Sequence, residues 1–528
     1  MERIITIARA GIIAIALTAT SCGTLDLTPS TELTSASVYN DPANYKLVLA
    51  KLYAGLAVSG QQGPAGKPDI SGIDEGFSTY LRQYWKAQEL TTDEAVIGWN
   101  DGSLPDYHEM DWTSANEFIS AMYNRIYYQI TLCNEFIRET TDDKLSSRGI
   151  SGQAATDARL FRAEARFLRA LSYYHALDMF GNVPFVTEAD APGSFLPRQT
   201  TRTELFNYIE SELKAIENEL AAPRQNEYGR ADKGAAWTLL TKLYLNAQVY
   251  TGAGRYTDAI TYANKVIQSN AYALEPTYQR LFLADNNNSK EIIFAITFDG
   301  QRTKTWGGMT FLVHAPVGGS MDPKQFGING GWAGVRATRS FVEKFSDVTG
   351  KTDTRAMFYT NGQTLEISDI FTFSNGYAIT KYKNLTTAGV AGSDPEGNFP
   401  DTDFPMLRLA DVYLMYAEAV LRGGTGGDLT TALNYVNLLR QRAYGGASGN
   451  VSSINLQFII DERARELYWE AHRRTDLIRF GLFTTQAYVW PWKGGVQQGR
   501  AVEDFRTLFP IPASDLVANP NLKQNPGY

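Results

Sequence analysis

Two helical hairpins with the same layout constrain the fold of this 528-residue chain most strongly. Apolar and small residues recur at helical spacing over 235–250 and 256–268, and again over 409–421 and 429–442. Glycine-containing turns join the two helices of each pair. Such pairs bury their apolar faces only against neighbouring pairs, so the pattern predicts a tetratricopeptide-type scaffold of stacked helices. Two unrelated amphipathic hairpins are the alternative.

The chain between residues 275 and 405 differs from the helical parts on either side. It is rich in Gly, Asn, Asp, Thr and aromatic residues, and 291–298 has the pattern of a strand. Long irregular segments in a compact protein usually carry function, and residues 60–115 have a similar composition. We therefore expect a mostly α-helical protein in which a loop-rich ligand-binding subdomain with a few short strands is inserted into the scaffold.

This composition divides the mature chain into three regions. The first is an N-terminal helical region at 41–274, with binding loops at 60–115 and a long helix over 155–180. The loop-rich region follows at 275–405, and a C-terminal helical region spans 406–528.

The N-terminus has the features of a bacterial lipoprotein. Residues 1–21 form a signal peptide in which Arg3 and Arg9 accompany an apolar run over 10–19. This run is shorter than the roughly twenty residues that span a membrane. Small residues stand directly before Cys22, as in a lipobox, so we expect Cys22 to be lipidated and 22–40 to be a tether. Plain secretion with an incidental cysteine is the alternative.

Composition argues against several classes of partner and site. The chain has 49 Lys and Arg against 57 Asp and Glu, a net charge of −8, and no long basic run that would favour nucleic acid. Two cysteines and four scattered histidines do not form a disulfide framework or a histidine-rich metal centre. We expect no nucleic-acid partner, and contact with the membrane through the lipid alone.

Catalytic patterns are incomplete. Gly350-Lys351-Thr352 ends like a phosphate-binding loop, but Phe345 stands where the first glycine is required. Three adjacent acidic pairs could serve a glycoside hydrolase only if separate segments brought two carboxylates together: Asp74-Glu75, Asp93-Glu94 and Asp461-Glu462. The last pair begins an arginine-rich helix that we interpret as structural. The sequence therefore contains no complete catalytic constellation.

Three tryptophans in the loop-rich parts are the strongest candidates for ligand contact. Trp306 and Trp332 adjoin glycines, and Trp99 is followed by Asn100 and Asp101. Glycine beside a loop tryptophan would leave the ring face open, and flat apolar rings with polar neighbours suit sugar rings. The alternative is that each tryptophan closes a small loop core.

Several segments of the sequence resemble those of a known family, the SusD/RagB outer-membrane lipoproteins of Bacteroidetes. The similarity lies in the helix at 161–174 that runs into 180–184, the segment 229–236, the helix from Asp461 to Gly481 and the C-terminal segment 509–528. The resemblance implies a non-enzymatic, lipid-anchored protein on the cell surface that captures oligosaccharides, or in some members peptides. It also implies a partner, a TonB-dependent porin of the SusC type, and a tetratricopeptide-type fold.

Within the family the chain resembles the starch-binding branch, through segments 72–76, 89–94 and 490–495. The resemblance implies that an aromatic arc binds an α-1,4-glucan. The residues that match are Trp306 and Trp332 in the arc and Arg82 as a hydrogen-bonding group. The third arc position falls on Ile97, two residues before Trp99, and the family's Asn falls near Asp101 or Gly102. We therefore expect Trp99 to stack on the ligand and Asn100 and Asp101 to bond its hydroxyls. These departures leave a different glycan, or a peptide, as the alternative ligand. A lipid-anchored glycoside hydrolase is a more remote one.

The resemblance also implies a structural calcium ion. Asp285, Asn287, Asp401 and Asp403 match acidic loops that hold calcium in the starch-binding branch, and oxygen ligands suit Ca²⁺. Ordinary turns would have the same composition. No other cofactor is expected.

Overall fold

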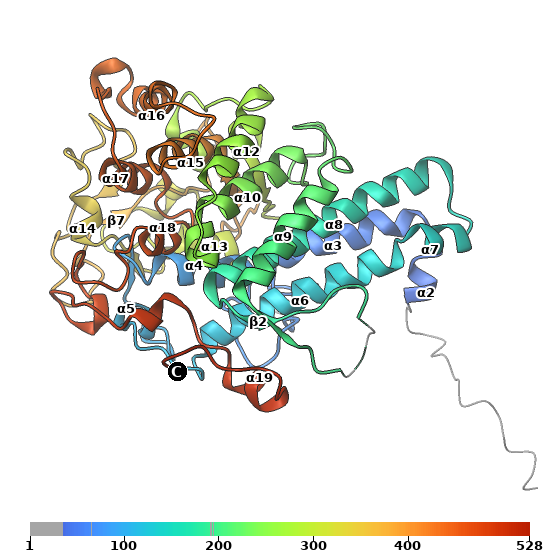
Figure 1. Cartoon of the computed structure of the whole chain (residues 1–528). Helices are drawn as coiled ribbons and strands as arrows, with labels where there is room; N and C mark the ends of the chain where they lie inside the picture. Colours follow the sequence, from blue (N-terminus) through green and yellow to red (C-terminus); the bar gives the residue numbers. More distant parts are fainter. Residues whose placement is uncertain (1–34, 65, 191–192, 194) are drawn as a thin grey trace, which may run out of the picture. The chain divides into compact units, whose positions relative to one another are not determined.

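The computed structural model describes residues 35–64, 66–190, 193 and 195–528 (Figure 1). The signal peptide, Cys22 and most of the tether at 22–40 lie outside the described residues. One helical turn, α2 (Ser35–Val38), falls within the predicted tether. Residues 45–528 form one compact unit, in which the helical and loop-rich regions are joined.

A series of antiparallel helices forms the scaffold. Its members are α3 (Ala43–Ala57), α4 (Tyr80–Glu89), α6 (Glu117–Glu139), α8 (Gly152–Met179), α9 (Arg202–Ile216), α10 (Lys233–Leu245), α12 (Tyr256–Gln268), α15 (Leu409–Leu421), α16 (Leu429–Tyr444), α17 (Leu456–Leu467) and α18 (Arg473–Arg479). Contacts run from α6 to α8, α9, α10, α12, α15 and α16 in that order. The two predicted hairpins are therefore neighbours, because α12 packs on α15 (Figure 1). The expected helical scaffold is confirmed.

Shorter elements complete the fold. The remaining α-helices are α5 (Asp106–Glu109), α7 (Asp142–Ser147), α11 (Ala247–Thr251), α13 (Gly308–His314), α14 (Arg339–Val342) and α19 (Ala513–Ala518). The 3-10 helices are Tyr278–Phe282, Asn286–Asn288, Pro323–Phe326, Ala447–Gly449, Lys493–Gly495 and Asp504–Thr507. The strands are β1 (Val96–Ile97), β2 (Val183–Pro184), β3 (Gln199–Thr200), β4 (Ile292–Ile296), β5 (Val335–Arg336), β6 (Phe358–Tyr359), β7 (Ala378–Ile379) and β8 (Phe404–Arg408).

The loop-rich region is closed at its base by one pair of strands. β4, the predicted strand, pairs antiparallel with β8, and the register shifts twice along the pair. All residues of both strands are buried. The segment between them is thereby an insertion into the scaffold, as the composition predicts, with its two ends held side by side.

Two predicted helices are interrupted in the structure. The helix expected over 235–250 ends at Asn246, whose side-chain amide donates to the Lys242 carbonyl at 2.9 Å, and α11 follows. The helix expected from Asp461 to Arg479 is two helices, α17 and α18, because Trp469 and Ala471 adopt φ values of 62° and 63°. Asp461 and Glu462 therefore lie in the middle of α17 and do not begin a helix.

The predicted loops at 60–115 contain a helix that the sequence pattern misses. All ten residues of α4 are buried, including its charged side chains, although the apolar residues Tyr80, Leu81, Tyr84 and Trp85 recur at helical spacing. α4 packs against α6, α13 and α18, and it carries Arg82. Arg82 is thus held on a buried helix and is not part of a loop.

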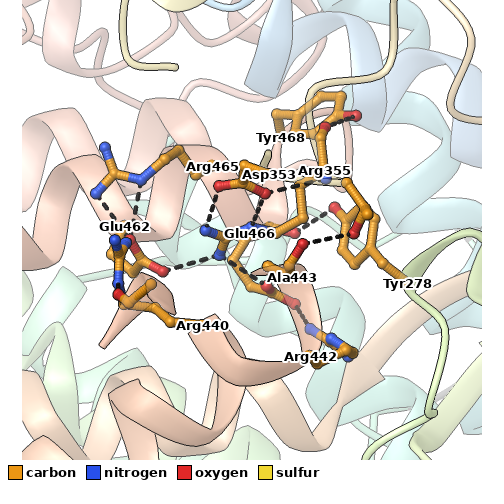
Figure 2. A network of polar contacts seen from close by, with 12 residues as sticks. Tyr278, Asp353, Arg355, Arg440, Arg442, Ala443, Glu462, Arg465, Glu466 and Tyr468 are labelled. Atoms are coloured by element: carbon orange, nitrogen blue, oxygen red, sulfur yellow. Dashed lines mark hydrogen bonds and ion pairs between the residues drawn. The ribbon is translucent and has the colours of Figure 1, made fainter. Parts of the chain in front are cut away.

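Buried ion pairs join the insertion to the scaffold (Figure 2). Arg355, in the insertion, donates to Glu462 at 2.8 Å and to Glu466 at 3.2 Å on α17, and to Asp353 at 2.7 Å. These four side chains are almost completely buried. Burial opposes ionisation of Glu462, but Arg355 and its neighbours lower the pKa of that carboxyl to about 2. The arginine-rich segment is therefore structural, as predicted from its composition.

Candidate functional site

Pairing of two short strands brings two of the predicted tryptophans together. β1 runs antiparallel to β5, with Ile97 opposite Val335, so Trp99 after β1 meets Trp332 before β5. Their ring centroids are 6.3 Å apart. Trp306 lies 6.4 Å from Trp332, at a tilt of 49°. The three rings therefore form a continuous row with Trp332 in the middle, which we call the tryptophan arc.

The arc is accessible and is backed from one side. Trp306 is 37% exposed, and Trp99 and Trp332 are partly exposed. The ring of His314 stacks on Trp332, with centroids 4.9 Å apart and planes 24° apart. Because His314 covers one face of the central ring, a ligand would meet the other face.

His314 is fixed in this position by backbone carbonyls. Its Nδ1 lies 2.7 Å from the Gly330 oxygen and its Nε2 lies 2.8 Å from the Asn398 oxygen. The backbone N–H of Trp332 donates to the His314 carbonyl at 2.9 Å. Burial lowers the pKa of His314 below its ordinary value, and the two carbonyls oppose this effect. Sequence reasoning did not assign His314 a role, because no motif links it to Trp332.

Two of the glycines beside the tryptophans allow close packing of the backbone, which the sequence did not predict. A Cβ on Gly331 would lie 2.1 Å from the Val317 carbonyl, and a Cβ on Gly307 would lie 2.2 Å from the Thr79 hydroxyl. These glycines let two backbone segments approach closely, and they do not simply uncover a ring. Ala333, directly after Trp332, has a φ of 51°, a strained conformation of the kind that gathers at functional sites.

Arg82 lies beneath the arc. Its Nη1 donates to the Gly76 carbonyl at 3.0 Å and to the Trp306 carbonyl at 3.4 Å, and its guanidinium carbon is 5.9 Å from the Trp99 ring centre. The residue is 4% exposed, and its Nε has no hydrogen-bond partner among the described residues. Burial lowers the pKa of Arg82 to about 9, and Asp101 is one of the carboxylates that oppose this. Arg82 therefore links two arc residues from below.

Asn100 and Asp101 are both exposed beside Trp99. The Asp101 carbonyl accepts a hydrogen bond from the Leu104 N–H at 2.9 Å, which closes the loop after the arc. The arrangement leaves both side chains available to ligand hydroxyls, the role that the sequence predicts for them.

The predicted calcium ligands close loops instead of converging. Asp285 accepts from the Thr387 N–H at 2.9 Å, Asp401 from the Gly300 N–H at 2.7 Å, and Asp403 from the Phe298 N–H at 2.7 Å. Asn287 accepts from the neighbouring Asn288 amide at 3.1 Å. In this geometry the four side chains do not form a ready calcium site, and calcium stays a prediction.

Acidic side chains gather at one other place. Among the described residues, Asp106, Glu109 and Asp111 are the one group that brings three candidate metal-ligand atoms within 4.8 Å of one another.

The acidic pairs considered as catalytic carboxylates form hydrogen bonds and ion pairs within the protein. Glu75 accepts hydrogen bonds from the Thr305 hydroxyl at 2.6 Å and from the Trp306 N–H at 3.0 Å. Asp93 and Glu94 are 0% and 1% exposed, and Asp93 binds Arg473 at 2.6 Å. Glu462 lies in the network of Figure 2. None of these pairs presents two free carboxylates at a surface.

Two protein-family models and a well-matched relative assign the chain to a family. A model described as "SusD family" matches residues 351–528, and one described as "Starch-binding associating with outer membrane" matches residues 26–245. The chain is 37% identical to the starch-binding protein SusD of Bacteroides thetaiotaomicron, over 96% of each protein. The chain belongs to the SusD family.

Other relatives agree with this assignment. SusD-like protein P2 of Formosa agariphila is 26% identical to this SusD-family chain over 98% of each. Surface glycan-binding protein A from Bacteroides thetaiotaomicron, solved in complex with laminarihexaose, is 21% identical, with a TM-score of 0.68 over 92% of this chain and 99% of that one. A likeness at this identity shows the shared SusD fold. No helix in the described part of the chain has the length and apolar character needed to cross a membrane.

Proposed function

We propose that this SusD-family chain is a surface glycan-binding protein that captures starch-like α-1,4-glucans and passes them to a SusC-like TonB-dependent porin. The observation that carries the proposal is the tryptophan arc, in which three adjacent indoles offer a tilted row of apolar faces. Neighbouring ring planes are tilted by 46° and 49° to each other, so the three faces are not coplanar, which suits a ligand that is not flat. Aromatic faces supply affinity for sugars, and Asn100 and Asp101 supply hydrogen bonds.

The proposal is supported by the relatives. A starch-binding protein is 37% identical over nearly the whole chain. The match to a family associated with the outer membrane supports attachment there, through a lipid on Cys22. Capture by stacking requires no bond cleavage and no cofactor, so we propose a binding protein and not an enzyme.

Another glycan is the second candidate. A structural neighbour with the same fold was solved with laminarihexaose, so the SusD fold accommodates ligands other than starch. The polar groups around the arc differ from those that the resemblance implies, at Asp101 in particular.

Affinity electrophoresis of residues 23–528 would separate these candidates. The protein is run through gels that contain amylopectin, pullulan, dextran or laminarin. Retardation by amylopectin and pullulan alone supports an α-1,4-glucan ligand. Retardation by laminarin alone would overturn starch and keep glycan capture, and free migration in all four gels would argue against both candidates. Co-purification with the porin, with and without glucan, tests the delivery step.

A further inference from the structure

A cavity lies against one side of α3, and none of the three tryptophans of the arc lines it. Its volume is about 320 Å³, and its floor includes Ala50, Ala54 and Val58. A neighbouring cavity of about 270 Å³ also borders Ala50 and Ala54, so the depression continues along the helix. We call the first cavity the α3 cleft. Ligand pockets span roughly 300–1,000 Å³, so the cleft suits one or two sugar rings.

A cluster of polar groups stands at the rim of the α3 cleft. The Asp69 carboxylate lies 4.0 Å from the Lys51 ammonium and 3.9 Å from Nη1 of Arg125. The Arg125 side chain is 1% exposed, and its Nη1 has no hydrogen-bond partner among the described residues. Tyr128 also lines the cleft, and burial, followed by the nearby Asp69 carboxylate, raises the pKa of its phenol to about 12. A carboxylate, an ammonium and a neutral phenol therefore lie side by side.

This chemistry suits the hydroxyl groups of a saccharide. A carboxylate accepts hydrogen bonds from sugar hydroxyls, and the Lys51 ammonium and Tyr128 phenol donate to sugar oxygens. The small apolar side chains of the floor suit the C–H face of a sugar ring. An anion such as phosphate would be attracted by Lys51 and Lys304, which both line the cleft, and opposed by Asp69, which is 21% exposed. Arg302 also lines the cleft, but it is paired with Asp299 at 3.1 Å.

The cleft and the arc share one buried support. The Asp69 N–H donates to the Ser59 carbonyl at 2.8 Å, and the Ser59 hydroxyl donates to Glu75 at 2.5 Å. The same Glu75 carboxylate accepts from the Trp306 N–H at 3.0 Å. Glu75 is 8% exposed, so it is a structural link and not a ligand contact. Both binding surfaces are thereby fixed by the same hydrogen-bonded segment.

We propose that the α3 cleft is a second saccharide-binding site, which takes one or two neutral hexose units and is separate from the tryptophan arc. The inference rests on the proposed function in so far as it assumes a glycan ligand. Two sites on one anchored chain raise the overall affinity for a long polysaccharide without any new contact at either site.

A steric block with a matched control tests the proposal. Ala50→Trp places a large ring in the cleft from an exposed helical position, whereas Leu47→Trp adds the same ring to α3 at a residue that is 68% exposed and does not line the cleft. Both are made in a Trp332→Ala background, and saturation-transfer NMR with maltotriose detects binding outside the arc. We expect Leu47→Trp to keep the signal and Ala50→Trp to lose it. Tyr128→Phe, which removes only a hydroxyl, should weaken it if Ala50→Trp does not fold.

The outcomes separate the two proposals. Binding by the wild type that disappears with Trp332→Ala alone would overturn the α3 cleft as a site and keep glycan capture by the arc. Equal signals from Ala50→Trp and Leu47→Trp would overturn it as well. No contact between the wild type and maltotriose, maltoheptaose or laminarihexaose would overturn the proposed function itself. Displacement of maltotriose from the Trp332→Ala protein by inorganic phosphate would show that the cleft is an anion site instead.

Discussion

The indole N–H of Trp99 donates a hydrogen bond to the backbone carbonyl of Trp332 at 3.3 Å, so each of these residues fixes the position of the other. The indole N–H is the only polar group of the Trp99 side chain, so this bond satisfies it and the ring faces are available for other contacts. The pair also shows how a binding surface is built from two distant segments, since the bond continues the antiparallel pairing of β1 and β5.

Trp332→Ala should weaken glucan binding by about 2 kcal/mol or more, roughly thirtyfold, because the central ring of the arc is an aromatic anchor. Its partial exposure predicts a small effect on the melting temperature. Trp237→Ala is a matched control, since Trp237 is a half-buried tryptophan of α10 that bonds Glu217 at 2.9 Å. Titration calorimetry with maltoheptaose measures the affinity of both variants. Equal losses of affinity in the two variants would refute the assignment of the arc.

His314 should act as a positioning residue behind Trp332. His314→Ala removes the stacked ring and both bridging contacts, so we expect an affinity loss that approaches that of Trp332→Ala. His314→Phe keeps a ring and should retain part of the affinity. A neutral imidazole has one N–H, so only the protonated ring donates to both the Gly330 and Asn398 carbonyls.

Because only the protonated imidazole donates two hydrogen bonds, the contribution of His314 to the affinity should depend on pH. Because burial lowers the pKa of His314, wild-type affinity should rise only as the pH falls below the ordinary range of histidine, whereas His314→Phe should show no such rise. Parallel pH profiles of the two proteins would remove the proposed role.

Lys86 should limit the stability of the fold at neutral pH. Its side chain is 0% exposed, and its Nζ has no hydrogen-bond partner among the described residues, although it lies 3.6 Å from the Phe118 ring centre. Burial, followed by Arg82, lowers the pKa of Lys86 well below its ordinary value. The unfolded chain binds this proton at pH 7 more readily than the folded chain does, which favours unfolding.

Lys86→Met should therefore raise the free energy of unfolding at pH 7 by about 1–3 kcal/mol. The gain should shrink as the pH approaches about 10.4, where the unfolded lysine also loses its proton. Urea denaturation at pH 7 and pH 10 measures this, with the exposed Lys523→Met as the control. Destabilisation by Lys86→Met would mean that the Phe118 ring outweighs the cost of burial.

Calcium binding would engage carboxylates that already accept hydrogen bonds. The Asp401 oxygens accept from the Gly300 N–H and from the Ser393 N–H and hydroxyl, and a carboxylate has about four acceptor sites. If the predicted site forms, calcium should raise the melting temperature of the wild type above its value in EDTA, and Asp401→Asn should abolish the difference. Identical melting curves in calcium and EDTA would remove the prediction.

Longer helices with a regular apolar spacing were predictable from the sequence, whereas the short helix α4 was not. α12 and α15 have the predicted bounds, because each has one apolar face and a glycine-containing turn beside it. α4 was missed although Tyr80, Leu81, Tyr84 and Trp85 have helical spacing, because it is only ten residues long and lies in a segment whose Gly, Pro and Asp content predicts loops. The break at Trp469 depends on positive φ values at Trp469 and Ala471, which tertiary contacts impose. Neither tryptophan nor alanine is a residue type that predicts a positive φ.

The members of the candidate site were predictable, but their arrangement was not. Trp99, Trp306 and Trp332 stand out as loop tryptophans beside glycine or polar residues. Their adjacency depends on a pairing of two-residue strands, which are too short to produce an alternating pattern. His314 and the Arg82 position beneath the arc arise from packing between distant segments, and a single sequence has no signal for such contacts.

A buried pair of glutamates should make the stability of the fold depend on pH. Glu94 accepts from the Trp469 N–H at 3.2 Å, and Glu89 accepts from the Ala471 N–H at 2.6 Å, so both carboxyls hold the kink between α17 and α18. Burial raises the pKa of Glu94 to about 7, and Arg473 opposes this. The pKa of Glu89 is also raised, by burial and then by Glu94.

The sign of the effect follows from the raised pKa. The stabilisation from a protonated Glu94 is fully present below about pH 4.3, where the unfolded carboxyl is also protonated, and it is lost as the pH rises through about 7. Glu94→Gln stays neutral and can still accept from Trp469. We therefore expect the difference in unfolding free energy, variant minus wild type, to increase from pH 5 to pH 8 and then to level off. Urea denaturation at intervals of one pH unit measures it, with Glu503→Gln as the control because that side chain is 67% exposed. A constant difference across this range would show that Glu94 keeps an ordinary pKa despite its burial.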